Sequence, residues 1–191
     1  MKKLIMMMML VLPLAAMAQN LVNFVLKPDG TYQTEDGKDF IVVPFEGKTA
    51  HQIYQELATN VGSTYNDPSK VMSGVEDASI KIRAFSDDLI RAKPFGYVKD
   101  QSFGGFYQLE FRIKDGRVRV SAPIIEDRVE YRDIQGKYTH GNFSKYIEAY
   151  FKNGVLQDKK QKNYDIVVAK MNGIINSILH TSTVQDAQDD W

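Results

Sequence analysis

An Asp-Gly pair at residues 115–116, between two runs of alternating polarity, constrains this chain more than any other sequence feature. Residues 107–114 and 117–122 each alternate apolar with polar side chains. An Asp-Gly pair in that setting favours a two-residue hairpin loop, which fixes the register of both strands. We therefore predict an antiparallel hairpin with one core face and one solvated face. The expected cross-strand pairs are Ile113 with Val118, Phe111 with Val120 and Leu109 with Ala122 on the core face, and Arg112 with Arg119 on the solvated face.

The segments around this hairpin predict the other main elements. Residues 39–45 are short and β-branched, which predicts a buried strand. A helix is expected from Thr49 to Gly62, because Thr49 and Gln52 fit a capping box and glycine often follows a helix. Alternation over residues 80–85 predicts a further strand. The apolar stripe over residues 164–179 predicts an amphipathic helix that packs on the sheet.

The remaining segments carry weaker patterns. Residues 19–38 hold two turn signals and predict an N-terminal arm or hairpin. Residues 123–139 are polar and without a period, so a loop or irregular excursion is expected. Residues 144–152 favour a short helix, and the alternative is that Asn153-Gly154 forms a second hairpin turn. Residues 183–191 are an acidic tail that we expect to be mobile.

Together these elements predict one α+β domain over residues 39–182. Its architecture is an antiparallel sheet with two amphipathic helices packed on one face. Four parts of this pattern resemble an exported bacterial domain family of unknown function: residues 40–49, Ile53-Tyr54, residues 106–120 and the closing helix. Members of that family have a two-layer, TATA-binding-protein-like fold. The resemblance implies no catalytic residue, cofactor or ligand, and one fold hosts unrelated functions, so DNA binding does not follow from it.

Residues 1–18 have the pattern of a secretory signal peptide. Lys2 and Lys3 form a basic start, residues 4–14 are apolar, and Ala16-Met17-Ala18 is a small-x-small cleavage signal. The apolar run is shorter than the roughly 20 residues that a bilayer-spanning helix needs. We expect cleavage after Ala18 and a periplasmic or extracellular protein without a transmembrane segment. The alternative is a retained signal anchor.

Composition excludes several classes of site. The chain has no Cys, 3 His, 24 Lys and Arg, and 24 Asp and Glu. Without cysteine there are no disulfides, thiolate zinc sites, iron-sulfur clusters or cysteine nucleophiles. No two histidines have the spacing of metal ligands, so we expect neither a metal site nor a cofactor. The balanced charge provides no net field to attract nucleic acid.

The candidate binding residues are four cations on the solvated face of the predicted hairpin: Arg112, Lys114, Arg117 and Arg119. The register sets Lys114 opposite Arg117 and Arg112 opposite Arg119. Like charges across a ladder destabilise a sheet unless anions or acidic side chains lie between them. This pattern predicts a surface for an anionic partner. The alternative is a solvated face on which charge opposes aggregation.

Two other sequence patterns are weaker indications of a functional site. His140 lies near Asp133 and Ser144 in the sequence, but no Gly-x-Ser-x-Gly segment supports a hydrolase triad. Gly104-Gly105 is expected to form a strand bulge, because no helix or Gly-Lys-Ser/Thr sequence follows it as in a phosphate loop.

These observations favour a non-catalytic binding or adaptor module of the cell envelope, with an envelope protein or an anionic glycan as partner. The rival function is a hydrolase of envelope or dietary polymers that uses the carboxylate pairs Asp87-Asp88 or Glu126-Asp127. Two buried carboxyls about 5 to 9 Å apart in a cleft would favour that rival. No catalytic residue is predicted, and the oligomeric state is left open.

Overall fold

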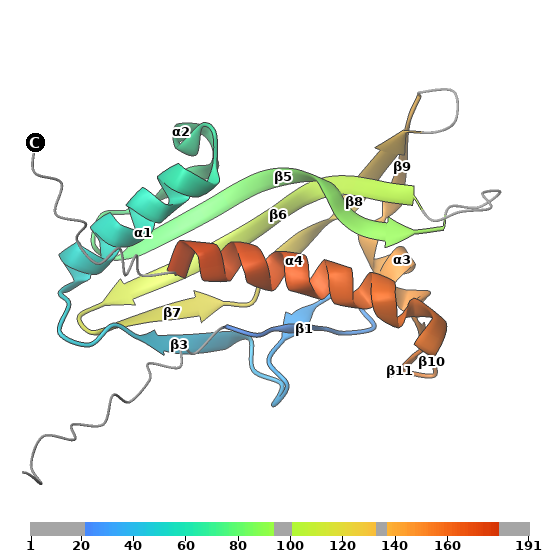
Figure 1. Ribbon diagram of the computed structural model, residues 1–191, viewed down its shortest axis with the longest axis horizontal. Helices are drawn as coiled ribbons and strands as arrows, with labels where there is room; N and C mark the ends of the chain where they lie inside the picture. Colours follow the sequence, from blue (N-terminus) through green and yellow to red (C-terminus); the bar gives the residue numbers. More distant parts are fainter. Residues whose placement is uncertain (1–21, 94–100, 133–136, 180–191) are drawn as a thin grey trace, which may run out of the picture.

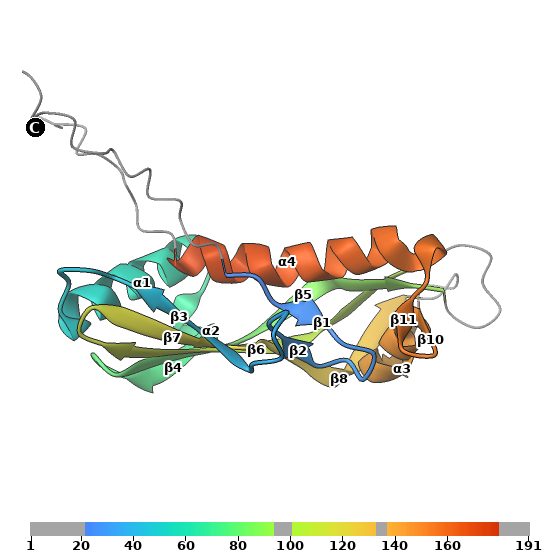
Figure 2. The ribbon, with the colours of Figure 1, turned by 90° about the horizontal axis from the view of Figure 1, so that it is seen from below.

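A seven-stranded antiparallel sheet covered by helices on one face forms the body of the protein (Figures 1 and 2). The structure is a computed structural model, and it describes residues 22–93, 101–132 and 137–179. The strand order is β3-β7-β6-β5-β4, with β8 paired to β6 and β9 paired to β8. This arrangement confirms the predicted α+β class.

The sheet strands are β3 (Phe40–Pro44), β4 (Met72–Val75), β5 (Ser79–Ala92), β6 (Gln101–Lys114), β7 (Arg117–Ser121), β8 (Ile124–Arg132) and β9 (Tyr138–Asn142). Two small hairpins lie outside it: β1 (Val25–Leu26) with β2 (Tyr32–Gln33), and β10 (Phe151–Lys152) with β11 (Val155–Leu156). The helices are α1 (Ala50–Thr64), α2 (Pro68–Val71), α3 (Phe143–Glu148) and α4 (Gln161–Leu179), and the 3₁₀ turn η1 (Asp158–Lys160) precedes α4.

The long hairpin of β5 and β6 is the centre of the sheet, and β6 changes partner along its other edge. Near the 115–116 turn β6 pairs with β7, and the predicted Ile113–Val118, Phe111–Val120 and Arg112–Arg119 pairs are present. The predicted pair of Leu109 with Ala122 is wrong, because β7 ends at Ser121 and β8 takes over the edge of β6. The register of the β6–β8 pairing shifts between Gly105 and Tyr107, so the glycine pair lies at an irregularity, as predicted.

Helices α1 and α4 cover the apolar face of the sheet, as the two amphipathic patterns predict (Figure 2). Ile53, Leu57 and Val61 of α1 are buried, together with Val167, Met171 and Ile175 of α4. Their spacing is that of one helix face, and burial of such faces is the main source of stability in a fold of this size. The Thr49–Gln52 capping box is present. Gly62 does not end α1, however, and the helix continues to Thr64.

The N-terminal segment is tied to α4 through its backbone. Asn172 accepts from the Phe24 amide at 2.9 Å and donates to the Phe24 carbonyl at 2.9 Å. One turn later, Asn176 makes the same pair of bonds with Val22, at 2.8 and 2.9 Å. Two asparagines thus supply to this extended segment the bonds that a neighbouring strand would give. The segment is part of the core, since Phe24 and Leu26 are buried.

Two sequence predictions about the sheet are wrong. Residues 123–139 were expected to form a loop, but β8 and the start of β9 occupy most of this range. Strand β8 has no polarity period because β6 and β9 hold it by backbone bonds while most of its side chains stay partly exposed. Residues 39–45 contain the strand β3, but it is an edge strand rather than a buried one. Its position at the edge explains how the sheet tolerates Pro44.

Both interpretations of residues 144–154 are partly correct. The helix is present as α3, although it ends at Glu148. Asn153 and Gly154 then form the turn between β10 and β11, with φ of 53° and 78°. Positive φ at both turn residues is the geometry that favours Asn-Gly in two-residue hairpins. The predicted signal peptide at 1–18 and the tail at 183–191 lie outside the described residues.

Candidate functional site

The face of the sheet opposite α1 and α4 carries the four predicted cations. Arg112, Lys114, Arg117 and Arg119 alternate with the buried side chains of β6 and β7, so their side chains lie together on this face. We call these four residues the basic face. The register sets Arg112 opposite Arg119 and Lys114 opposite Arg117. Sequence alternation and the tight turn were sufficient to predict this juxtaposition.

One carboxylate, Glu110, lies between the basic face and its neighbours. Its two oxygens are 3.4 Å from Arg112 and 3.5 Å from Lys81 of β5. The hydroxyl of Ser121 donates to it at 3.2 Å. Burial opposes ionisation of Glu110, but Arg112, Ser121 and Lys81 together hold its pKa below the usual value. Glu110 is therefore the acidic neighbour of both Arg112 and Lys81, and these three side chains together keep a net positive charge.

The other three cations of the basic face have no acidic partner among the described residues. Across residues 22–93, 101–132 and 137–179, no carboxylate oxygen lies within 4.0 Å of a side-chain nitrogen of Lys114, Arg117 or Arg119. Arg119 stacks on the ring of Phe40 at 4.1 Å, and its Nε is buried without a hydrogen-bond acceptor from the described part of the chain. An unsatisfied buried donor costs about 1–3 kcal/mol. Arg119 thus combines a stacking contact with one buried donor that has no acceptor in the described part of the chain.

Exposed apolar side chains lie on the same side of the sheet as the cations. Val42 lies opposite Arg119 in register and is 49% exposed, whereas Phe85, 45% exposed, pairs with Phe106, which lies six residues along β6 from Arg112. The ring of Phe85 meets that of Phe106 edge-on at 5.2 Å. Arg83 stacks on Phe106 at 4.0 Å and makes two hydrogen bonds to Glu126, at 2.6 and 2.9 Å. The face therefore mixes arginines with exposed aromatic and aliphatic groups.

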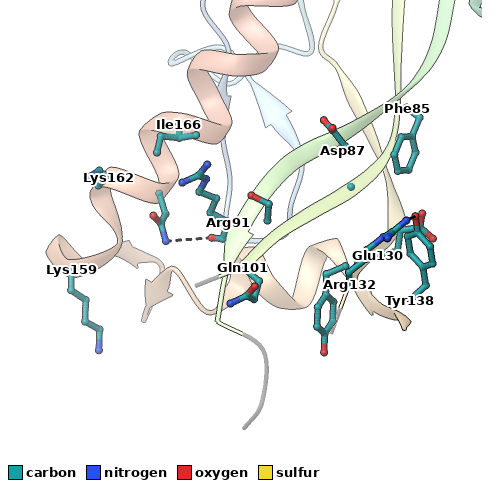
Figure 3. A pocket seen from close by; sticks show the side chains of 14 residues that line it. Phe85, Asp87, Arg91, Gln101, Glu130, Arg132, Tyr138, Lys159, Lys162 and Ile166 are labelled. Atoms are coloured by element: carbon teal, nitrogen blue, oxygen red, sulfur yellow. Dashed lines mark hydrogen bonds between the residues drawn. The ribbon is translucent and has the colours of Figure 1, made fainter. Parts of the chain in front are cut away.

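A cleft of about 910 Å³ lies at the other end of the sheet. Lys159 and Lys162 approach it from η1 and the start of α4, while Glu130 and Tyr138 come from β8 and β9 across the end of the β5–β6 hairpin (Figure 3). Asp87 of β5 also lines it. The lining mixes both signs of charge, and within it Arg132 donates to the hydroxyl of Tyr138 at 2.7 Å.

Three of the four carboxylates proposed for a hydrolase, Asp88, Glu126 and Asp127, accept hydrogen bonds from neighbouring groups. Asp88 accepts from Ser102 at 2.6 Å, and this bond, aided by nearby cations, holds its pKa below the usual value. Glu126 is held ionised by Arg83, with its pKa lowered. A general acid needs the opposite shift, a raised pKa from burial or a like charge. Asp87-Asp88 lies in β5, and Glu126-Asp127 lies in β8 and not in the loop predicted for residues 123–139.

The histidine candidate also has another role. His140 faces two charged neighbours, Arg128 with Nη2 at 2.8 Å from its Nε2 and Glu130 at 3.7 Å from its Nδ1. Ser144 follows the start of α3, and Asp133 lies outside the described residues. The geometry of a Ser-His-Asp triad, with a hydroxyl donating to the imidazole, is not formed between His140 and Ser144 in the described region.

A group of metal-ligand type was missed by the sequence analysis. His51, Glu76 and Asp77 each offer one ligand atom, and these atoms lie within 4.8 Å of one another. Asp77 is 26 positions from His51 in the sequence, so no local spacing could reveal the group. In the sequence, His51 is distinguished only by its place in the first turn of α1.

Comparison with known proteins gives two similar structures. No family model matches the sequence, and no curated protein matches it. A TBP-like protein from Parabacteroides distasonis is 12% identical, with a TM-score of 0.47 over 74% of this chain and 92% of that one. A DUF4468 family protein from Bacteroides ovatus is 10% identical, with a TM-score of 0.43 over 75% and 86%. The names of both proteins match the family that the sequence resembles. Within the described ranges, no helix has the length and apolar character needed to cross a membrane.

Proposed function

We propose that this protein is an exported, non-catalytic binding module of the cell envelope, and that its basic face holds an acidic, partly apolar protein surface. One observation carries this proposal: Lys114, Arg117 and Arg119 lie side by side without an acidic partner among the described residues. Like charges arranged across a ladder destabilise the isolated sheet. Carboxylates from a partner would relieve that repulsion and would steer association.

The composition of the face favours a protein partner over a glycan. Protein interfaces are enriched in arginine and aromatic residues, which act as the dominant contacts in many complexes. Here Arg112, Arg117 and Arg119 stand beside Phe40 and Val42. A purely polyanionic ligand would leave the exposed apolar groups without partners. An anionic glycan is accordingly the competing outcome of the test.

The rival function, polymer hydrolysis by paired carboxylates, has less support. Asp88 and Glu126 both have lowered pKa values, because Ser102 and Arg83 respectively stabilise their ionised forms. A carboxyl that stays ionised at neutral pH is a poor general acid. Asp127 also has a structural hydrogen bond, since it accepts from the backbone amide of Ser144 at 2.8 Å.

Export rests on the sequence pattern of residues 1–18. The prediction is that the mature protein begins at Gln19 and is recovered from the periplasm or the medium. N-terminal sequencing of the protein from its host tests this claim. A mature chain that began at Met1 would contradict it.

Site-specific photo-crosslinking in the native host tests the binding proposal. Val42 is replaced by a photo-reactive residue, because it is exposed and lies opposite Arg119. Val155, 69% exposed in the distant β10–β11 hairpin, is the matched control position. We expect one reproducible protein adduct from position 42 and none of the same mass from position 155.

The other outcomes contradict the proposal in different ways. A carbohydrate adduct from position 42 would replace the protein partner by a glycan. The absence of any specific adduct, in cells that export the protein at normal levels, would rule out the basic face as a docking surface. Mass spectrometry of any adduct from position 42 distinguishes a protein partner from a glycan.

A further inference from the structure

The end of the sheet near the 115–116 turn brings three segments together. The first turn of α1 approaches the β4–β5 turn, which contains Glu76 and Asp77. The backbone carbonyl of Ala78 in that turn accepts from the amide of Ile113 in β6 at 2.8 Å. The Thr49 capping box fixes the start of α1, and Asp115 accepts from the amide of Ala50 at 2.7 Å. Hydrogen bonds from both backbone and side chains therefore hold all three segments in place before any ligand binds.

This framework brings one imidazole and two carboxylates together. Nδ1 of His51 lies 3.0 Å and 3.1 Å from the two carboxylate oxygens of Asp77. Glu76 contributes an oxygen within 4.8 Å of the other two ligand atoms. Asp77 has a φ of 59°, a left-handed conformation that aspartate tolerates better than most residues. The turn conformation thus directs consecutive acidic residues toward the same histidine.

From this geometry we propose that His51, Glu76 and Asp77 form a binding site for one divalent transition-metal ion of the zinc type. Zinc accepts imidazole nitrogen and carboxylate oxygen at about 2.0–2.2 Å, usually with four ligands, so water would complete the coordination. Calcium and magnesium prefer sets composed only of oxygen atoms. The bound ion would link α1 to the β4–β5 turn in a chain that contains no cysteine for a disulfide.

The charges around the three residues are compatible with a cation. No lysine or arginine nitrogen lies within 4.0 Å of the Glu76 or Asp77 carboxylates in the ranges that the structure describes. His140, which also has an acidic neighbour, lies in a different charge environment. His140 has Glu130 at 3.7 Å, but the Arg128 guanidinium lies 2.8 Å from its Nε2 and would repel a metal ion. This site is independent of the proposed function, and neither requires the other.

Zinc titration of the tag-free mature protein tests the proposal, with cobalt absorption as a second probe. We expect one ion per chain and a rise of the midpoint of thermal unfolding on zinc addition, because an ion that binds only the folded state stabilises it. His51→Ala and Asp77→Asn should each weaken binding by about tenfold or more, since each removes a charged or basic ligand. His140→Ala should bind zinc as the wild type does.

The test remains informative whichever variants are stable. His51 is exposed, so its replacement should leave the fold intact, and circular dichroism verifies this. Asp77→Asn keeps a residue that tolerates the left-handed turn. Unchanged zinc affinity in His51→Ala, or loss of binding in His140→Ala alone, would overturn the proposal. Absence of stoichiometric zinc binding to the wild type would do the same.

Discussion

At the scale of single residues, polar side chains in this protein substitute for backbone partners. Asn172 is buried in α4, with 8% of its surface exposed, yet both polar atoms of its side chain have partners in the N-terminal segment. Asp127 of β8 likewise provides hydrogen-bond acceptors at the start of α3. Its carboxylate oxygens accept from the backbone amide of Ser144 and from the side chain of Asn142. Neither role has a sequence signal, since the partners are distant in the chain.

Replacing Asn172 by alanine should lower the free energy of unfolding by about 2–4 kcal/mol, because a buried amide and a buried carbonyl of Phe24 both lose their partner. Urea unfolding at neutral pH measures the change. Asn176→Ala is the matched control, and its effect should be smaller because its bonds to Val22 are only partly buried. A larger loss in Asn176→Ala than in Asn172→Ala would contradict this account.

Asp127→Ala should cost about 1 kcal/mol at pH 7, the usual effect of removing a helix cap. Hydrogen bonds from Asn142 and Ser144 lower the pKa of Asp127 in the folded state. A lowered pKa means that the ionised carboxylate stabilises the fold above its unfolded pKa, and that this stability is lost as pH falls through the folded pKa. The difference from wild type should therefore shrink as the pH falls below about 4, the ordinary pKa of an aspartate, in urea unfolding. A difference that grew with acidity would refute the assignment.

At the scale of secondary-structure elements, strong periodic patterns were predictable and edge elements were not. The hairpin of β6 and β7 and the helix α4 follow from alternation and from a continuous apolar stripe. Strands β8 and β9 were missed because cross-strand backbone bonds, and not a buried face, hold them in the sheet. The buried strand expected at residues 39–45 became the edge strand β3 because a short apolar run does not reveal its number of neighbours.

Replacing glycine by alanine should change stability in opposite directions in the helix α4 and in the strand β6. Gly173 lies in the interior of α4, and a Cβ added there would meet nothing within 4 Å outside the backbone of its own helix, so Gly173→Ala should raise stability by about 0.5–1 kcal/mol. In β6, a Cβ on Gly104 would lie 2.6 Å from Phe85 and 3.0 Å from the Ser86 carbonyl. Gly104→Ala should therefore lower stability by about 1–3 kcal/mol. Thermal and urea unfolding measure both, and equal effects of one sign would contradict the packing described.

At the scale of the whole molecule, the two faces of the sheet have different roles. One face is buried beneath α1 and α4 (Figure 2), and the other presents the basic face with the exposed Val42 beside it. The sequence predicted the grouping of the four cations because they lie on one local hairpin. It could not predict the position of Phe40 beneath Arg119, or the meeting of His51 with Asp77, because these contacts depend on how distant elements pack.

The central claim is that the charge of the basic face holds the partner. The decisive measurement is the yield of the position-42 photo-crosslink in cells that carry the double variant Arg112→Glu, Arg119→Glu. Both side chains lie on the open face, and unfolding measurements verify that the variant is folded. The matched control is Lys159→Glu, Lys162→Glu, which reverses two exposed cations beside the distant cleft.

We predict that the adduct falls about tenfold or more in the first variant, because loss of about 1.4 kcal/mol of binding free energy changes affinity by that factor. The control variant should give the wild-type yield. An undiminished adduct in the Arg112→Glu, Arg119→Glu variant, or an equal loss in both variants, would contradict the claim that the basic face is the binding surface.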